Sequence, residues 1–435
     1  MLGGGGFSEY FSVNRPHKME MEGVTELGVE GPYVRSLGDV NSVIRHAKLS
    51  RSDLKETSQV LYFSSEFPEY KLFECDGVLL KHLEGGGELY VRGRPTDKAV
   101  VCTRDQTYDL KSAETSNSLL LVPGLKMADE VPASGTARKV EDEVESEGVI
   151  EEKRIVGVYG EYFELKKIKP RMGRLQALLS ARPYNGPENE VDVSEETADA
   201  KTYTLPGLLE EVQASEGEIR RHLDELEALE INGRWRVLDH EYQFRALSFL
   251  LNLVEGNSWP PDGVPIGETM STLNGLVPDV ILDHICRVYL QPTEDFNEDG
   301  DKLYRLHEFK ICRFLGESLL KPVDKFNLDD FLTAWSSSVP AGLQTDLKQL
   351  DGLAMYDENT NPPVIWYFPE TKLPEDLSER FQELFQQRRA WSLEQIAPYV
   401  ASFATEKQTV NALLTKHARS ANVGGRKMYS ARHGK

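Results

Sequence analysis

The most regular alternation of apolar and polar positions lies in residues 89–124. Short apolar runs in this segment are separated by residues that favour turns. The runs are Leu89–Val91, Ala99–Cys102 and Leu119–Val122, and the turns are Pro95–Asp97 and Arg104–Asp105. Apolar runs divided in this way predict β-strands joined as hairpins.

Further strand candidates flank this segment. They are Tyr70–Cys75 and Val78–Leu80 upstream and Arg154–Leu165 downstream. Six or seven short strands with few helical signals predict a small curled sheet or β-barrel. Such a sheet has free backbone edges, and a strand from a partner is one way to cover them.

From about residue 165 the spacing of apolar residues changes from 2 to 3.6, which indicates helices. One order then recurs at intervals of about 65 to 75 residues: two helices, a third helix and a short polar hairpin. In the first copy, the two opening helices are Leu175–Ser180 and Leu205–Val212. Ser215–Glu218 is a capping box for the third helix, which has an apolar stripe. Asn232-Gly233 then predicts a hairpin turn.

The second and third copies carry comparable stripes. In the second copy these are Phe244, Leu247, Leu251 and Val254, then Val277, Ile281, Ile285 and Val288, with a hairpin around the acidic loop Glu294–Asp301. In the third copy, Asn327 is a predicted helix cap, a helical stripe continues through Leu343, Leu347 and Leu350, and Val364–Phe368 is a strand.

The fourth copy is built from Leu377–Phe385, a capping box at Ser392–Gln395 and a last helix capped at Thr405–Gln408. Pro398 is expected to kink or end its helix. The repeated order predicts a tandem array of winged-helix domains. The first copy is either a winged helix or a helical linker, because its opening helix precedes an acidic segment.

The expected fold is therefore α+β, with an N-terminal small β-barrel or sheet domain followed by tandem winged-helix domains. The expected parts are a loose leader (1–55), the β domain (56–165), a helical linker or first winged helix (166–241), and winged helices at 242–305, 306–370 and 371–435.

Two segments rich in acids interrupt these parts. Residues 127–152 carry nine acids against Arg138 and Lys139, and Pro187–Ala200 carries six acids and no base. Both are interpreted as solvated loops, with an acidic docking motif as the alternative for the first.

Composition limits the class of protein. A chain of 435 residues is long enough for several domains, and its net charge of −21 argues against nucleic acid wrapping the whole surface. The four cysteines (Cys75, Cys102, Cys286 and Cys312) form no CxxC pair, which suits buried thiols in a reducing compartment. No apolar run approaches 18 residues, so no membrane span is expected. The N-terminus lacks a signal-peptide pattern, so the nucleus or cytosol is expected.

Motifs for catalysis are missing from the sequence. The only Gly-Lys pair is Gly434-Lys435, so no P-loop for ATP is present. No serine lies in a G-x-S-x-G motif. The nine histidines are dispersed and have no metal-ligand spacing. The chain is therefore predicted not to be an enzyme, and no cofactor is expected.

Charge distinguishes the fourth copy from the others. Residues 242–305 and 306–370 have net charges of −6 and −5, whereas residues 371–435 have +5. Five cations are predicted to contact DNA phosphates there, with a frayed basic tail as the alternative. They are Lys416 and Arg419, placed on the outer face of the last helix, and Arg426, Lys427 and Arg432, placed on or beyond the wing.

One stretch also carries a resemblance. KAVVCTRDQTYDLKSAETSNSLLLVPG (98–124) resembles the defective-in-sister-chromatid-cohesion family, an accessory subunit of an alternative replication factor C clamp loader. The likeness continues, in order, in VQASEGEI, GRWRVL, DLKQLDGLA, WSLEQIAPYV and EKQTVNALLTKHARS. It covers about residues 55–430, and the long leader and the enlarged acidic segment depart from the family.

The resemblance implies a non-catalytic subunit of a seven-membered loader in the nucleus. Its β domain would form a shared barrel with the tail of the large ATPase subunit and with a small accessory subunit. Its winged helices would engage the leading-strand polymerase, DNA polymerase epsilon, and DNA. The outcome would be loading of PCNA and sister chromatid cohesion. The alternative is a tandem winged-helix subunit of a transcription complex, since general transcription factors also join a β-barrel to winged helices.

Overall fold

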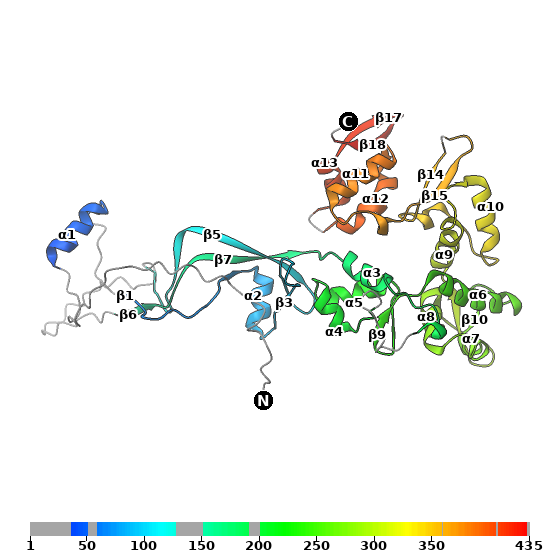
Figure 1. Ribbon diagram of the computed structural model, residues 1–435, viewed down its shortest axis with the longest axis horizontal. Coiled ribbons are helices and arrows are strands. Elements are labelled where there is room, and N and C mark those ends of the chain that lie inside the picture. Colours follow the sequence, from blue (N-terminus) through cyan, green and yellow to red (C-terminus); the bar gives the residue numbers. More distant parts are fainter. Residues whose placement is uncertain are drawn as a thin grey trace, which may run out of the picture. The chain divides into compact units, whose positions relative to one another are not determined.

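The computed structural model describes residues 36–50, 59–127, 151–190, 201–358, 360–405 and 408–432. Within them the fold is mixed α+β, as predicted: thirteen α-helices, an N-terminal curled half-barrel sheet and several three-stranded sheets (Figure 1). The chain divides into two compact units. One comprises residues 1–76 and 110–165, and the other comprises residues 77–109 and 166–435.

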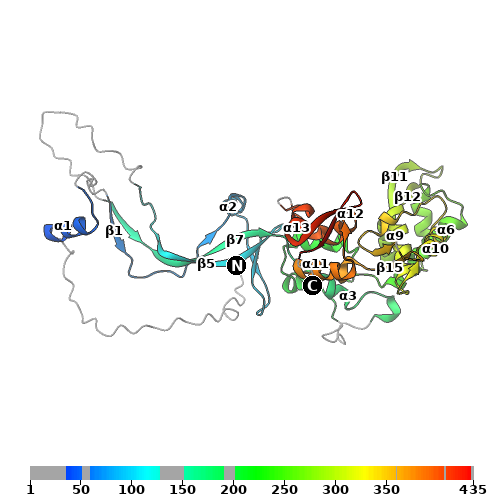
Figure 2. The same cartoon turned by 90° about the horizontal axis from the view of Figure 1, so that it is seen from above.

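The first unit is built mainly from extended chain. Its elements are α1 (Leu37–His46), β1 (Gln59–Phe63), β2 (Phe73–Glu74), most of β5 (Thr107–Leu121), β6 (Glu151–Ile155) and β7 (Gly157–Ile168). Strands β1 and β6 pair in parallel, as do β2 and β7. Figure 2 shows β5 and β7 as long neighbouring strands, and they are adjacent in the sheet order. The predicted run at Leu119 is the end of this single strand of 15 residues.

Part of the predicted leader is helical. Helix α1 begins with a capping box of Ser36 and Asp39, although the leader was expected to be loose. Residues 1–35 of the leader lie outside the described residues, as do 128–150 and 191–200, which hold most of the two acidic segments.

The second unit begins with α2 (Gly77–Glu84), β3 (Tyr90–Arg92) and β4 (Val100–Cys102). The two predicted hairpins are confirmed, because β4 pairs antiparallel with both β3 and the start of β5. The predicted strand at Val78–Leu80 is wrong, since these residues belong to α2. The apolar run is followed by residues that favour a helix, and the helix ends just before Gly86, whose φ of 80° suits a helix end.

The first helical module consists of α3 (Gly173–Ser180), α4 (Leu205–Glu211), α5 (Glu216–Glu225), β8 (Leu229–Ile231) and β9 (Arg234–Arg236). The capping box between Ser215 and Glu218 forms as predicted. Asn232 and Gly233 adopt φ angles of 51° and 77°, which a two-residue hairpin turn requires.

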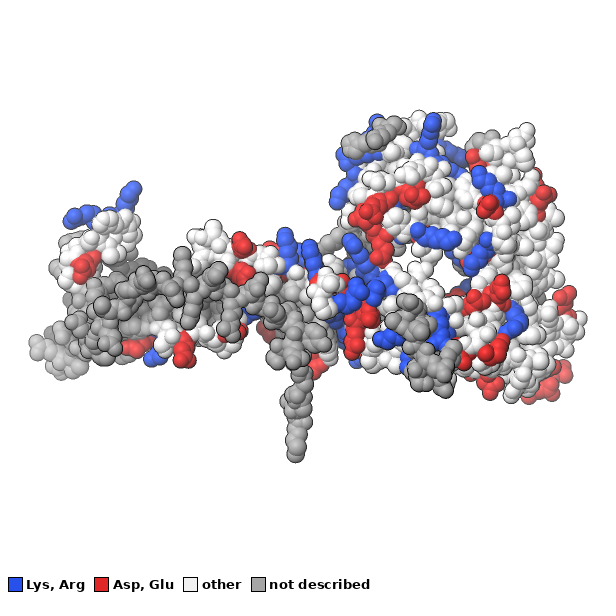
Figure 3. All heavy atoms as spheres, in the orientation of Figure 1, with Lys and Arg blue, Asp and Glu red and all other residues white. Residues whose placement is uncertain are grey.

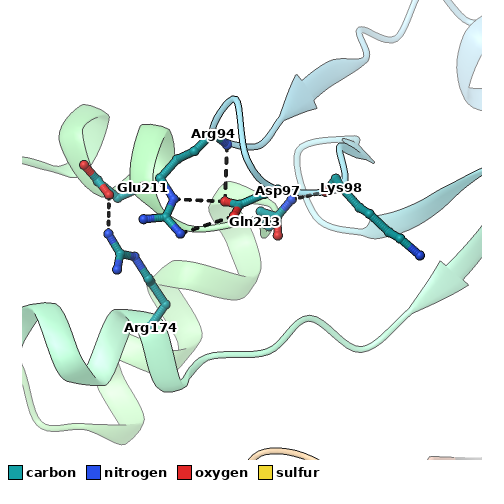
Figure 4. A network of polar contacts seen from close by, with 6 residues as sticks. All are labelled: Arg94, Asp97, Lys98, Arg174, Glu211 and Gln213. Atoms are coloured by element: carbon teal, nitrogen blue, oxygen red, sulfur yellow. Dashed lines mark hydrogen bonds and ion pairs between the residues drawn. The ribbon is translucent and has the colours of Figure 1, made fainter.

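Polar contacts attach the β3–β4 hairpin to this module (Figure 4). Within the hairpin Arg94 binds Asp97 at 2.9 Å, and within the module Arg174 of α3 binds Glu211 of α4 at 2.6 Å. Between the two, the guanidinium of Arg92 donates to the carbonyl oxygen of Leu209 at 2.8 Å. The side chain of Gln213 donates to the carbonyl oxygen of Lys98. The contacts of Arg92 and Gln213 join residues 77–109 to the first helical module, although β3 and β4 are also strands of the five-stranded sheet that contains β5 and β7.

The second module consists of α6 (His240–Gly256), β10 (Val264–Pro265), α7 (Ile266–Leu273), α8 (Asp279–Tyr289), β11 (Leu290–Phe296) and β12 (Lys302–Leu306). The predicted stripe of Val277, Ile281, Ile285 and Val288 is buried, with at most 5 % exposure. Helix α7 takes the place of the second helix of the repeated order, to which the sequence pattern assigned no residues, and β10 was not predicted.

The third module consists of α9 (Glu308–Leu320), β13 (Phe326–Asn327), α10 (Leu328–Ser338), a 3₁₀-helix η5 (Leu347–Leu350), β14 (Ala354–Asp357) and β15 (Val364–Tyr367). Asn327 caps α10 as predicted. The stripe from Leu343 forms no α-helix, because Asp346 caps a single 3₁₀ turn and Gly352, with φ 72°, redirects the chain.

The helical modules share their cores. Phe314 and Leu315 of α9 belong to the hydrophobic cluster of the second module. Met355 and Leu373 belong to the cluster of the fourth module, which follows η6 (Glu370–Lys372). The backbone N–H of Gly173 in the first module also donates to the carboxylate of Glu375. The modules therefore pack as one body. No helix in the described part of the chain has the length and apolar character needed to cross a membrane.

Candidate nucleic-acid interface

The fourth module carries the predicted DNA-binding residues. It consists of α11 (Leu377–Gln387), β16 (Trp391–Ser392), α12 (Leu393–Val400), η7 (Ala401–Phe403), α13 (Val410–His417), β17 (Ala418–Val423) and β18 (Arg426–Ala431). The sheet order is β16-β18-β17, so the last strand lies between the other two.

Helix caps explain where these helices begin. Ser392 and Gln395 form the predicted capping box of α12. Pro398 lies inside α12, which ends at Val400, in line with the expected early end. The predicted cap at Thr405 is wrong. Thr405 and Gln408 exchange backbone hydrogen bonds in a turn, and the Thr409 hydroxyl caps α13 by accepting from the N–H of Ala412.

Apolar packing holds α13 in place. Leu413 and Leu414 are 1 % and 0 % exposed. The ring of His417 stacks on Phe381 with a centroid distance of 5.2 Å. Burial and the nearby Lys416 lower the pKa of His417, so the ring carries less positive charge than a free imidazole.

All five predicted cations are exposed, but they do not share one helix. Lys416 is near the end of α13, whereas Arg419 lies in β17. Its placement on the last helix was therefore wrong. The helix ends at His417 because Ala418 is extended, with φ −127° and ψ 163°, and pairs with Ala431.

The hairpin divides the cations into two groups. At its base, Arg419 donates to the carbonyl oxygen of Ala431 at 3.0 Å, and Arg432 donates to that of Lys416 at 2.5 Å. Each guanidinium has five N–H groups, so both keep further donors for an anion. Lys416, Arg419 and Arg432 are thus brought together.

Arg426 and Lys427 lie at the other end of the hairpin, where they pair with Val423 and Asn422. The alternation of a strand places them on opposite faces. Lys427 is on the face of buried Tyr429, and its ammonium lies 5.3 Å from the centre of that ring. Because β18 pairs with both β16 and β17, residues 426–431 are part of the sheet and are not a frayed tail.

A second basic segment was missed. Residues 166–174 contain five bases and no acid, and all five are exposed. They are Lys166, Lys167, Lys169, Arg171 and Arg174. The contact of Gly173 with Glu375 places the end of this segment beside the start of the fourth module. The run of like charges was visible in the sequence. Figure 3 shows Lys and Arg gathered over α3 and also over the region of α13 and the β17–β18 hairpin.

One arginine of the fourth module has a different role. Arg380 is 7 % exposed and donates to the carbonyl oxygens of Tyr399 and Pro374 at 2.9 and 2.8 Å. Burial lowers the pKa of its guanidinium. Arg380 therefore joins α11 to the end of α12 and is not available to a phosphate.

The described residues present no reactive thiol cluster or metal centre. Burial raises the pKa of Cys286 to about 12 and that of Cys312 to about 11, so these thiols stay protonated. No group of three or more His, Cys, Asp or Glu residues in the described ranges could hold a metal ion. The modules and their charged surfaces suit association with other macromolecules.

Comparison with known proteins places the chain in a family. The sequence model of the family described as "Sister chromatid cohesion protein Dcc1" matches residues 70–400. The Xenopus laevis sister chromatid cohesion protein DCC1 is 39% identical over 400 residues, which cover 92% of this chain and 98% of that protein. The human DCC1 protein is 36% identical over 403 residues (92% and 98%), and the Saccharomyces cerevisiae protein is 23% identical over 391 residues (84% and 97%).

The chain belongs to the Dcc1 family of sister chromatid cohesion proteins. The resemblance seen in the sequence is thereby confirmed. The family name describes a role in cohesion and no catalytic activity.

Proposed function

We propose that this chain is a non-catalytic subunit of an alternative replication factor C clamp loader in the nucleus, where it supports PCNA loading and sister chromatid cohesion. The observation that carries the proposal is the incomplete sheet of the first unit. Family membership favours this function over the alternative of a transcription-complex subunit.

Large apolar side chains of the first unit are exposed. Phe63 of β1 is 67% exposed, Tyr70 is 57% exposed and Phe73 of β2 is 51% exposed. Leu61, Tyr62, Phe67, Leu119, Leu120 and Leu121 are exposed to between 37% and 49%. Apolar surface of this extent is typical of an interaction site. The two-stranded sheet of β1 and β6 also has free edges that a partner strand would satisfy.

The partners proposed for this surface are the C-terminal tail of the large ATPase subunit and the small accessory subunit. Strands from both would complete a barrel with the sheet of the first unit. The exposed apolar side chains would then become its core, and the unpaired backbone groups at the edges would gain hydrogen bonds.

The test uses the full chain co-expressed with both partners. Changing Leu61 and Phe63 to Ser should abolish co-purification, because two polar side chains would enter the shared core. The matched control is Phe296→Ser in the second module, whose side chain is 61% exposed. Equal co-purification of the double variant and the control would contradict the assembly.

We also propose that the helical modules are winged-helix domains. Three modules share one sheet order, in which the first strand pairs with the third and the third with the second. In the first module, Tyr203 forms an antiparallel bridge with Trp235 of β9, at the place of the missing first strand. This supports a reduced winged helix at residues 166–241 over a helical linker.

Duplex DNA is the proposed ligand of the fourth module. Lys416, Arg419 and Arg432 at the base of the hairpin, with Arg426 and Lys427 near its tip, would neutralise phosphates. Each contact releases condensed counterions, so changing all five residues to Ala should flatten the log–log salt dependence by about four to five units. Affinity should fall equally on unrelated DNA sequences, because phosphates carry no base information.

The control for this measurement removes exposed cations of the second and third modules: Arg305, Lys321, Lys325 and Lys348. It should leave the salt dependence nearly unchanged. A chain truncated after Ala421 is not a suitable control for loss of the basic C-terminal residues. The truncation would delete β18 and the buried Tyr429 and so disrupt the core of the module. An unchanged slope in the fivefold variant would disprove the DNA interface while leaving the loader assembly standing.

DNA polymerase epsilon is the partner proposed for the acidic second and third modules. Their net charges of −6 and −5 repel phosphate and favour contact with protein. Figure 3 shows acidic side chains gathered over the second module.

A further inference from the structure

A groove of about 1540 Å³ lies between the second and third modules. Helix α6 forms one wall, α9 forms the other, and the end of α10 with the following residues up to Ala341 closes one side. All these elements belong to the same compact unit. The loader and DNA-binding functions proposed above make no use of this groove.

Large apolar side chains line the walls of the groove among polar ones. Phe244 and Leu251 line it from α6, Leu319 lines it from α9, and Trp259 lines it from the loop after α6. Phe244 is 43% exposed, although it lies on the same face of α6 as buried Leu247 and partly buried Leu251. Water therefore contacts an aromatic ring that a partner would cover.

The groove is held open by a packed base. Leu315 at its floor is 6% exposed and belongs to the cluster that joins the two modules. His240 of α6 and Ser318 of α9, which both line the groove, are hydrogen-bonded at 3.1 Å, and His240 packs on Phe314 with ring centroids 4.8 Å apart. Such a site needs little rearrangement to accept a partner.

The rim of the groove is acidic at both ends of α6. Glu241 and Glu255 are exposed and lie 14 residues apart in the chain, which corresponds to about 21 Å along a helix. Lys321 on the opposite rim is paired with Glu317 at 3.9 Å. A partner would therefore meet two carboxylates on the α6 side, whereas the side chain of Lys321 on the α9 side is 44% exposed and has Glu317 beside its ammonium group.

We propose that this groove binds an amphipathic helix from a partner protein. An apolar face with residues at i, i+3 or i+4, and i+7 would cover Phe244, Leu251 and Leu319. Basic residues about 14 positions apart would face Glu241 and Glu255. The length of the groove along α6 corresponds to about four helical turns.

The probe for the test is a fluorescent helical peptide of about 15 residues with three leucines on one face and a lysine pair at each end. Anisotropy should show binding to the full chain. A scrambled peptide of the same composition should bind at least about tenfold more weakly, because it lacks the apolar stripe.

Two sets of variants locate the binding. Phe244→Ala with Leu319→Ala should weaken the lysine peptide by about tenfold or more, whereas Phe296→Ala outside the groove should not. Glu241→Lys with Glu255→Lys keeps the apolar walls and changes only surface charge. It should weaken the lysine peptide and strengthen the same peptide with glutamates at its ends.

Specific outcomes would overturn the proposal. One is equal binding of the helical and scrambled peptides. Another is equal loss in the groove variant and in Phe296→Ala when all variants show the same thermal melt. If the chain self-associates and Phe244→Ala abolishes this self-association, the groove binds a second copy of the chain instead. The peptide-binding assay contains neither DNA nor a loader subunit. A negative result would therefore leave the proposed function unaffected.

Discussion

The hydroxyl of Thr107 in β5 donates to the carboxylate of Glu218 in α5 at 2.5 Å. The same hydroxyl accepts from the N–H of Ser215 at 2.9 Å, so a strand residue joins the capping box of a helix 108 positions later. Thr107 and Ser215 are both fully buried. This group of three residues attaches the start of β5 to the first helical module.

Changing Thr107 to Val should therefore lower the free energy of unfolding by about 1–3 kcal/mol. Valine keeps the shape but removes a buried donor and acceptor, which leaves the N–H of Ser215 with a longer bond to Glu218. Urea unfolding monitored by circular dichroism measures the change. Thr333→Val on the exposed face of α10 is the control and should change stability by less than about 0.5 kcal/mol. Equal effects would show that the shared bonds do not stabilise the docking.

Changing Leu413 or Leu414 to Ala should cost about 2–5 kcal/mol each, because both side chains are fully or almost fully buried. In Leu414→Ala, hydrogen exchange should accelerate in α11, α13 and β18 and should spread to β14, since Leu414 and Met355 belong to the same hydrophobic cluster. Leu393→Ala, at a side chain that is 37% exposed, serves as the control. Faster exchange confined to α13 would contradict a shared core.

Stability should depend on the protonation of His284. Burial, with Arg287 and Lys310 nearby, lowers the pKa of this histidine to about 4 from its usual 6.5. Its Nδ1 accepts a hydrogen bond from the guanidinium of Arg287 at 2.9 Å, which requires a neutral ring. The unfolded chain binds the proton more readily between these two pKa values, so stability is full above about pH 6.5 and falls as the pH drops toward 4.

The expected loss over that range is about 3 kcal/mol. Urea titrations at pH 7.5 and 4.5 should show a clearly smaller pH effect in His284→Gln than in the unchanged chain. His46→Gln, at an exposed histidine of α1, should keep the full pH effect. A pH effect that is the same in His284→Gln would mean that other groups account for it.

Substitutions at Arg380 and Arg419 should have different effects, one on the stability of the fourth module and the other on DNA binding. Arg380→Met removes donors from three backbone carbonyl oxygens and should lower stability by about 1.5–3 kcal/mol. Arg419→Ala should leave the melting temperature nearly unchanged and reduce the salt slope by about one unit. Calorimetry and salt-dependent duplex binding on both variants give the comparison. A reduced salt slope in folded Arg380→Met would contradict its structural role.

Local sequence signals determined much of the secondary structure. The capping boxes at Ser215 and Ser392 and the turn at Asn232-Gly233 act over a few residues. The stripe around Ile281 and Ile285 likewise needs only helical periodicity to be recognised. These elements could therefore be predicted without knowledge of the fold.

Where the local sequence signals are ambiguous, tertiary structure decided whether a segment forms a helix or a strand. Arg419 was assigned to a helix because its spacing continues the pattern of α13. It lies in a strand because Ala418 pairs with Ala431, and β18 in turn pairs with β16 across the module. Val78 in the same way belongs to a helix although its apolar run also suits a strand.

The groove and the shared cores also depended on tertiary structure alone. Phe244 has the same helical spacing as buried Leu247, yet its side chain is 43% exposed and lines the groove between α6 and α9. Thr107 and Glu218 are 111 residues apart, and no short-range pattern predicts that they meet. Periodicity and caps therefore determined which segments of this chain form helices and strands. Long-range packing decided which of their side chains meet one another and which remain exposed for a partner, because burial depends on neighbours that are distant in the sequence.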